Sequence, residues 1–289
     1  MRDGQASMTA RRVAAHRRSF HRVPCPWAGS TDGAAADQQL EADVADGLVV
    51  EPTPMTRYLQ ARTTFFDTVV VRSLDAGPDP DTGRDLDPDL GRSIDPGPGA
   101  GIVQAVSVGA GYDGRALRYA RSGVRWFELD HPATQADKRA RLDDLHIDTS
   151  GLTFVAADFA VDDVGAALGA AGHDPSQPTL FTCEGVAGYL DAGTLSALLA
   201  ALGRVASSGS RLAITLPLET QSDEQRLRRQ RLDAAVSSVG EPLASAVPRA
   251  ELAHRLLAAG WVVLRAADPA GVPIEQSPRS SAFVVATAA

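Results

Sequence analysis

Apolar runs and helical patterns alternate along most of this chain. Short apolar runs bounded by polar residues predict five strands, at 102–108, 124–129, 152–156, 179–183 and 211–216. Such alternation is typical of a doubly wound α/β fold, in which helices join parallel strands. Two more strands, at 261–265 and 282–287, are separated by a Gly/Pro-rich segment, so we expect them to pair antiparallel. The pattern predicts a mostly parallel, seven-stranded sheet with a reversed last strand.

The regular pattern begins near Pro54. From Tyr58 to Leu74 apolar residues recur at helical spacing, which predicts an amphipathic helix or a pair of helices. Between 77 and 101 the chain is rich in proline, glycine and aspartate, a composition that predicts an exposed acidic loop. We therefore expect one domain over 54–289 that contains this loop.

Residues 1–53 differ from the rest in composition. Arginines crowd into the first 22 residues, and the continuous apolar core of a secretory signal is lacking. We expect a disordered or leader segment here, with Met8 and Met55 as alternative starts. Because Lys138 is the only lysine of the whole chain, we attribute the arginines to coding bias and not to a binding function.

Composition narrows the classes of partner. The formal net charge of -8 argues against nucleic acid as the main partner, because phosphate binding needs a basic face. No apolar run approaches the roughly 20 residues that a bilayer crossing requires, so no membrane partner is expected. The two cysteines, Cys25 and Cys183, are too few for a disulfide framework or a zinc site. We expect a cytoplasmic protein without a metal centre.

The segment 102–115, IVQAVSVGAGYDGR, carries the clearest functional signal. An apolar strand ends there in closely spaced glycines, and Gly109 and Gly111 let the backbone turn sharply and approach a ligand. A helix follows, whose free N-terminal amides are expected to face that ligand. The next strand ends in Asp130, and a carboxylate there suits the two hydroxyls of an adenosine ribose. Gly114 completes G-x-G-x-x-G, a weak pattern that also fits a dinucleotide fold or an empty turn.

Five segments follow one another between about 56 and 216: YLQARTTFFD, VSVGAGYDGRALR, WFELDHPATQADK, FVAADF and AGHDPSQPTLFTCEGVAGYL. Together they resemble the leucine carboxyl methyltransferase family, in particular its actinobacterial branch of S-adenosyl-L-methionine-dependent methyltransferases. The resemblance implies the Rossmann-like class I methyltransferase fold, with S-adenosyl-L-methionine as the cofactor.

The resemblance also implies where the cofactor is held. It places Gly109, Ala110 and Gly111 beside the amino-acid portion and Asp130 at the ribose, with Glu128 as a secondary candidate for the ribose. It further implies that Asp158 and Phe159 bracket the adenine. Glu184 would bind the ammonium group of the methionine portion, and Arg62 would bind its carboxylate.

Some of these residues have a structural alternative. Asp158 also suits the N-cap of a helix starting near Asp162, and Arg62 also suits a surface ion pair. The chain departs from the family pattern at Gly114, in the acidic loop and after Leu218, which leaves the substrate pocket less defined than the cofactor site.

Methyl transfer depends more on the alignment of the reacting groups than on catalytic side chains. Methyl transfer from a sulfonium is an in-line displacement, and an ionised carboxylate needs no general base, whereas a hydroxyl does. The sequence offers no clear base near the glycine loop, which favours a carboxylate acceptor. We expect an O-methyltransferase acting on a carboxylate or hydroxyl of a small molecule. The alternatives are a non-catalytic cofactor-binding member of the family and an NAD(P)-dependent oxidoreductase.

Overall fold

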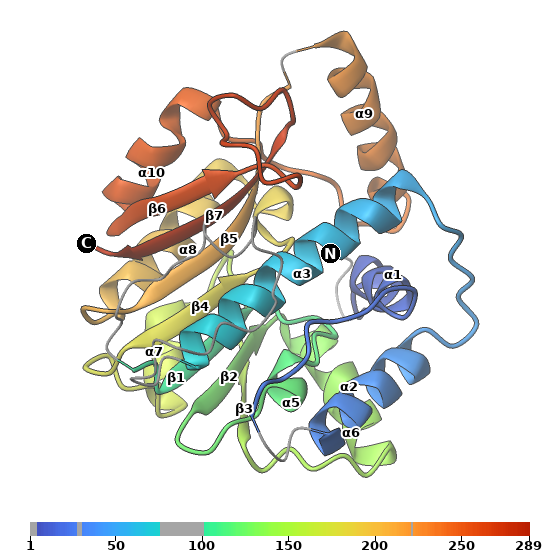
Figure 1. The fold of residues 1–289 in the computed structure, drawn as a ribbon, viewed down its shortest axis with the longest axis vertical. Coiled ribbons are helices and arrows are strands. Elements are labelled where there is room, and N and C mark those ends of the chain that lie inside the picture. Colours follow the sequence, from blue (N-terminus) through green and yellow to red (C-terminus); the bar gives the residue numbers. More distant parts are fainter. Residues whose placement is uncertain (1–4, 28–30, 76–100, 221) are drawn as a thin grey trace.

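The computed structural model describes residues 5–27, 31–75, 101–220 and 222–289. A seven-stranded sheet forms the middle layer, and helices cover both of its faces (Figure 1). The strands are β1 (Gln104–Val108), β2 (Arg125–Asp130), β3 (Leu152–Ala156), β4 (Thr179–Cys183), β5 (Arg211–Pro217), β6 (Trp261–Ala267) and β7 (Ser281–Ala288). The helices are α1 (Met8–Arg17), α2 (Thr31–Val44), α3 (Pro54–Leu74), α5 (Arg115–Arg118), α6 (Pro132–Asp144), α7 (Val164–Ala170), α8 (Ala192–Arg204), α9 (Asp223–Ser237) and α10 (Leu252–Ala258), with short 3-10 turns η1 (Ala187–Tyr189) and η2 (Arg249–Glu251).

The strand order is β3-β2-β1-β4-β5-β7-β6. Strands β1 to β5 run parallel, whereas β7 pairs antiparallel with both β5 and β6. This confirms the predicted sheet and its reversed last strand, and each predicted strand end lies within two residues of the observed one. The order reverses between β1 and β4, and ligands of open α/β sheets bind in the crevice at such a point.

The sheet is apolar on both faces because helices cover both. Successive strand residues point to opposite sides, so Val106 packs in the cluster with α7 and α8, whereas Ala105 packs in the cluster with α3. Helix α3 matches the amphipathic helix expected before 77. It begins at Thr53, whose side chain accepts from the backbone N–H of Thr56, and Pro54 fits its first turn.

Residues 5–27 and 31–53 are part of this fold, where the sequence led us to expect a leader or a disordered segment. Helices α1 and α2 pack on each other, and Ala14 and Leu40 share an apolar cluster with Tyr112 of the glycine loop. Arg17 and Arg22 form ion pairs here, and Arg22 donates to Asp67 of α3 at 2.8 Å. Arg22 and Asp67 are far apart in the sequence, so composition alone does not predict that they pair. The acidic loop predicted at 77–101 falls outside the described residues up to position 100.

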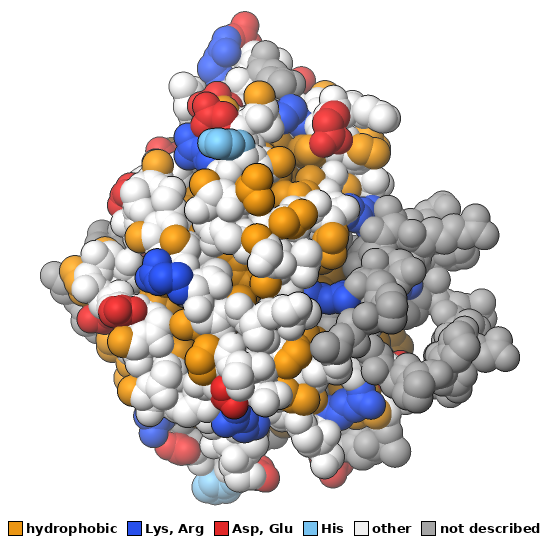
Figure 2. All heavy atoms as spheres, turned by 90° about the vertical axis from the view of Figure 1, so that its left-hand side faces the viewer, with side chains coloured by type: hydrophobic (Ala, Val, Ile, Leu, Met, Phe, Trp, Pro, Cys, Tyr) orange, Lys and Arg blue, Asp and Glu red, His pale blue; other side chains and the backbone are white. Residues whose placement is uncertain are grey.

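The edge strand β6 carries exposed apolar side chains, including Val262 and Leu264, and Leu257 of α10 is also exposed. Figure 2 shows the corresponding face, where apolar side chains lie scattered among polar and charged ones. This edge lies three strands from β4 in the sheet order. None of the described helices combines the length and apolarity that a bilayer crossing requires.

Candidate functional site

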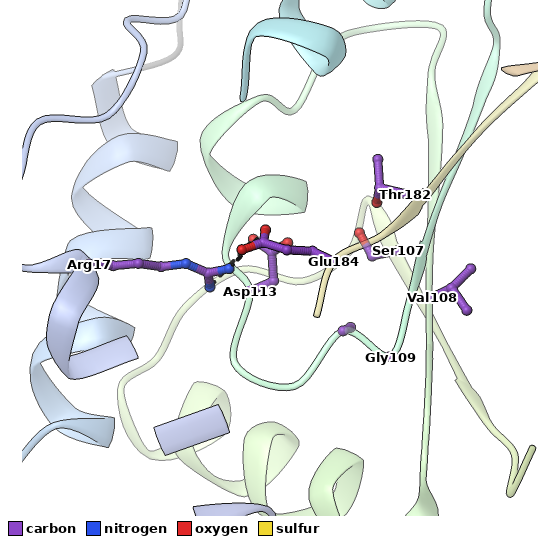
Figure 3. Close-up of a pocket in the computed structure, with 8 residues that line it drawn as sticks. Arg17, Ser107, Val108, Gly109, Asp113, Thr182 and Glu184 are labelled. Atoms are coloured by element: carbon purple, nitrogen blue, oxygen red, sulfur yellow. Dashed lines mark hydrogen bonds and ion pairs between the residues drawn. The ribbon is translucent and has the colours of Figure 1, made fainter. Parts of the chain in front are cut away.

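The candidate site lies at the carboxyl ends of β1, β2 and β4, where the strand order reverses. Parallel strands end at the same edge of a sheet, so the loops after these three strands meet there. A cavity at this place has about 220 Å³ of empty space, including space open to solvent. Figure 3 shows the residues that line it. Its lining residues are Arg17, Ser107, Val108, Gly109, Ala110, Asp113, Thr182 and Glu184.

The glycine loop needs its glycines because other residues approach it closely. Gly109 has φ +66°, and a Cβ there would lie 2.1 Å from the Cγ2 of Val186. Gly111 has φ +51°, and a Cβ there would lie 3.0 Å from the Cβ of Ala10. Both torsion angles lie in the left-handed region that favours glycine. The sharp turn predicted at these two glycines is present, whereas Ala10 as a neighbour of Gly111 was not predicted.

Several amides of this loop are already bonded within the protein. The N–H groups of Gly109 and Ala110 donate to the carbonyl of Leu129, at 2.7 and 3.3 Å. The helix expected after the loop is the single turn α5, and the N–H of Arg115 at its start donates to Asp113 Oδ1 at 3.0 Å. The N–H groups of Arg115 and Leu117 in this turn are thus bonded within the protein, and ligand binding by helix amides stays a prediction. Side chains provide the charge of the site.

Glu184, directly after β4, is surrounded by three arginines. Its Oε1 accepts from Arg62 Nε at 2.8 Å, and its Oε2 accepts from Arg17 Nη2 at 3.2 Å and from Arg115 Nη1. Figure 3 shows Arg17 pointing toward this carboxylate. Burial alone would raise the pKa of Glu184, but the three guanidinium groups outweigh burial and hold it well below its usual range. Glu184 is therefore ionised at neutral pH.

Arg115 connects Glu184 to a wider buried network. It is fully buried, and it donates to Asp67 Oδ1 at 2.7 Å, to Asp113 Oδ2 at 2.6 Å and to the carbonyl of Thr63 at 3.2 Å. Burial would raise the pKa of Asp67, but Arg22 and Arg115 lower it to about 2. The network joins α3, the glycine loop and the N-terminal segment, so Arg115 is held from several sides.

Asp130 ends β2 and touches the glycine loop. Its Oδ1 accepts from the N–H of His131 at 2.6 Å, and its Oδ2 accepts from the N–H of Gly111. Burial raises its pKa, and these two amides counteract part of that rise. The side chain is half-buried, which leaves it accessible at the edge of the sheet. Asp130, the predicted ribose-binding acid, thus contacts the glycine loop directly, and its role at the ribose stays a prediction.

Glu128, the secondary candidate for the ribose, has a different environment. It is buried, and its Oε2 accepts from Lys138 Nζ at 2.6 Å. Lys138 also donates to the carbonyl of Asp113, at 2.6 Å. Burial raises the pKa of Glu128 to about 7. Lys138 thus connects Glu128 to the glycine loop inside the protein, and Glu128 is not exposed at the surface of the site.

Asp158 and Phe159 lie in the loop after β3, next to the Asp130 end of the site. Asp158 Oδ2 is 3.9 Å from His131 Nε2. The N-cap alternative for Asp158 is wrong, because Asp163 caps α7 by accepting from the N–H of Ala166 at 3.0 Å. Phe159 is half-buried against the main core. The adenine bracket that the resemblance implies for these two residues stays a prediction.

Arg17, Asp113 and Arg115 are site residues that sequence reasoning missed. A signal for two of them was present, because Asp113 and Arg115 directly follow the glycines in the segment GYDGR. Arg17 gave no such signal, since it lies in the arginine-rich start that composition alone explained. Arg62 is not the surface residue that its alternative reading proposed, since it is buried against Glu184.

Comparisons with known proteins identify relatives of this chain. A family model described as "Leucine carboxyl methyltransferase" matches residues 93–203. A Mycobacteroides abscessus protein, named as a candidate S-adenosyl-L-methionine-dependent methyltransferase, is 30% identical over 257 residues, which cover 81% of this chain and 83% of that protein. A Mycolicibacterium vanbaalenii protein with the same description is 32% identical over 202 residues, which cover 68% of this chain and 57% of that protein. Several of these relatives are matched over only about half of their length.

A solved structure from Thermobifida fusca, described as a candidate methyltransferase, shares the fold. Its TM-score is 0.58 at 15% identity, over 99% of this chain and 96% of that one. The expected cofactor, S-adenosyl-L-methionine, is also the one in the names of the sequence relatives. The chain belongs to the leucine carboxyl methyltransferase family, within a group of actinobacterial relatives named for S-adenosyl-L-methionine-dependent methyl transfer, and it has their class I fold.

Proposed function

We propose that this protein is an S-adenosyl-L-methionine-dependent O-methyltransferase that acts on a small molecule, with a carboxylate as the favoured acceptor. One observation carries the proposal: the ionised Glu184 and the guanidinium of Arg62 lie together beside the glycine loop. The methionine portion of the cofactor carries an ammonium and a carboxylate at neutral pH, so it needs one partner of each charge.

The donor set fits the rest of the cofactor as well. Asp130 offers carboxylate oxygens at the end of the neighbouring strand, where a ribose would bind. Arg17 Nε is buried without a hydrogen-bond partner among the described residues. Buried donors are normally paired, so this orphaned N–H is consistent with an acceptor that the protein does not itself supply. Glu184, Arg62, Asp130 and the loop glycines would hold the cofactor.

A carboxylate acceptor is favoured because the cavity offers no general base. The cofactor would supply an electrophilic methyl group on a sulfonium, and the chain would align the acceptor and exclude water. None of the eight residues that line the cavity is His, Lys, Tyr or Cys. Arginines keep the pKa of both acids, Asp113 and Glu184, below the usual range despite burial, so neither is a good proton acceptor. An acceptor that is already ionised needs none.

Calorimetric titration tests cofactor binding. We expect S-adenosylhomocysteine to bind and NADH not to bind. Binding of NADH without S-adenosylhomocysteine would favour the oxidoreductase alternative. The antiparallel strand β7 already argues against that alternative, because the dinucleotide fold has a parallel sheet of order 3-2-1-4-5-6.

A transfer assay tests the acceptor class. The protein is incubated with S-adenosyl-L-methionine labelled in its methyl group and with matched sets of small carboxylic acids and phenols. Methyl esters release labelled methanol in mild base, whereas methyl ethers do not, so base lability separates the two products. We expect base-labile label. Binding of S-adenosylhomocysteine without any labelled product would favour the non-catalytic alternative.

A further inference from the structure

Helix α1 lies across the glycine loop and contacts the site at its C-terminal end. A Cβ added to Gly111 would lie 3.0 Å from Ala10, and Arg17, the last residue of α1, reaches Glu184 (Figures 1 and 3). Ala14, between them, is fully buried in the apolar cluster that contains Tyr112. The helix therefore covers the place where the amino-acid portion of a cofactor would bind.

Polar contacts hold the N-terminal end of α1. The backbone N–H of Met8 donates to Glu241 Oε1 at 2.9 Å, and the hydroxyl of Ser7 donates to Glu241 Oε2 at 3.0 Å. The N–H of Ser7 also donates to Thr134 Oγ1 at 3.2 Å. A helix of 10 residues is about 15 Å long, so these contacts are far from Glu184. Changes at Glu241 can thus loosen α1 without removing a group that holds the cofactor.

The cavity beside Glu184 is small with α1 in this position. Its empty space is about 220 Å³ even when open solvent is counted, and neither Asp130 nor Asp158 lines it. Both carboxylate oxygens of Glu184 are also taken, Oε1 by Arg62 and Oε2 by Arg17 and Arg115. Because Oε2 already accepts from two donors, an ammonium group that binds at Oε2 displaces one of them.

Arg17 is the most easily displaced of the three arginines. Arg115 is fully buried and bonded to two aspartates and a carbonyl, and Arg62 packs on the ring of Tyr58. Arg17 has the longest contact with Glu184, at 3.2 Å, and it lies 3.9 Å from Asp113. Its Nε has no partner among the described residues.

We propose that α1 is a latch that must open to admit the cofactor. Opening breaks the contacts of Ser7 and Met8 with Glu241 and separates Arg17 from Glu184, whose carboxylate then accepts the ammonium of the ligand. This inference rests on the proposed function, since it assigns the ligand to the same site. Arg17 and the ammonium group compete for one carboxylate.

The rate of ligand association tests the latch. The full chain is immobilised, and association of S-adenosylhomocysteine is followed by surface plasmon resonance for Arg17→Gln, Glu241→Ala and the control Arg12→Gln, which changes an exposed arginine of the same helix. We expect at least fivefold faster association for the first two variants and less than a twofold change for the control. Unchanged association in a folded Glu241→Ala variant, or an affinity lowered at least tenfold by Arg17→Gln, overturns the latch.

A reversible cross-link tests the same point within one molecule. Ser7→Cys and Glu241→Cys are combined with Cys25→Ser and joined by a short bis-thiosulfonate reagent that reductants cleave; Cys183 is fully buried. We expect association of S-adenosylhomocysteine to be at least tenfold slower until the link is reduced. Equal rates before and after reduction overturn the latch but leave the proposed function intact. Absence of binding to every version, including the original protein at calorimetric equilibrium, refutes the proposed function itself.

Discussion

The guanidinium of Arg62 donates through Nε to Glu184 Oε1 at 2.8 Å, although the two residues are 122 positions apart in the sequence. Arg62 comes from α3 and Glu184 follows β4, so this contact ties the helix on one face to the crevice at the sheet edge. Both side chains are nearly inaccessible, at 10% and 7% exposure. A buried ion pair contributes little net stability as a pair, but the loss of one partner leaves an uncompensated charge.

Glu184→Gln is therefore expected to affect both ligand affinity and stability. The Kd for S-adenosylhomocysteine should rise at least tenfold, or about 1.4 kcal/mol, because the ammonium loses its anionic partner. The free energy of unfolding should fall by about 3 kcal/mol, because three arginines lose their shared carboxylate. Calorimetry and urea unfolding measure the two effects. Glu219→Gln, at an exposed position, is the control, and an unchanged Kd in Glu184→Gln would reject the assignment of this residue.

Asp130→Asn tests the ribose position. The substitution keeps the size of the side chain but removes the charge, so we expect at least tenfold weaker binding of S-adenosylhomocysteine by calorimetry. Glu128→Gln is the matched comparison on the same strand. It should lower the free energy of unfolding, because Lys138 loses its buried partner, yet change the Kd less than threefold. If Glu128→Gln had the larger effect on the Kd, the two assignments would have to be exchanged.

Two glycine-to-alanine substitutions should change the free energy of unfolding in opposite directions. A Cβ at Gly114 would lie 1.9 Å from Asp37 Oδ1, and Asp37 binds Arg22 and Arg118. Gly114→Ala should therefore lower the free energy of unfolding, by about 1–3 kcal/mol. Gly169→Ala, in helix α7 with nothing within 4 Å of its added Cβ, should raise it by about 0.5–1 kcal/mol. Urea unfolding of both variants checks this, and a neutral Gly114→Ala would show that α2 yields readily at this contact.

Glu41 should make the stability of the protein depend on pH. Burial and the neighbouring Asp37 raise the pKa of Glu41 from 4.5 to about 7, although Arg22 lowers it in part. The folded protein then binds more protons than the unfolded chain between these values, so the contribution of Glu41 to the free energy of unfolding decreases as pH rises through that range. The decrease is at most about 3 kcal/mol.

Glu41→Gln removes this titration. We expect the unfolding free energy of the original protein, minus that of the variant, to fall between pH 5 and pH 8 in urea titrations. The exposed Glu51→Gln serves as the control and should give a flat difference. A difference for Glu41→Gln that rises with pH would show that ion pairing with Arg22 outweighs burial at this position.

Part of the site was predictable because it depends on local chain geometry. Gly109 and Gly111 adopt left-handed torsion angles directly after a strand, and Asp130 and Glu184 end or follow strands of the same sheet. A parallel sheet brings such positions to one edge. Arg17 was not predictable in this way, because its role depends on where α1 lies against the sheet.

The seven strands, their directions and the edge of the sheet at which the site forms follow from the order of residues along the chain. Burial on one or both faces of a strand sets the spacing of its apolar residues, and that spacing is visible in the sequence. The charge pattern of the site depends instead on tertiary contacts. Arg17, Arg62 and Arg115 share one carboxylate, and Glu128 is paired beneath the loop. Ion pairs form between side chains that folding brings together, so the positions of these residues in the sequence do not predict which of them pair.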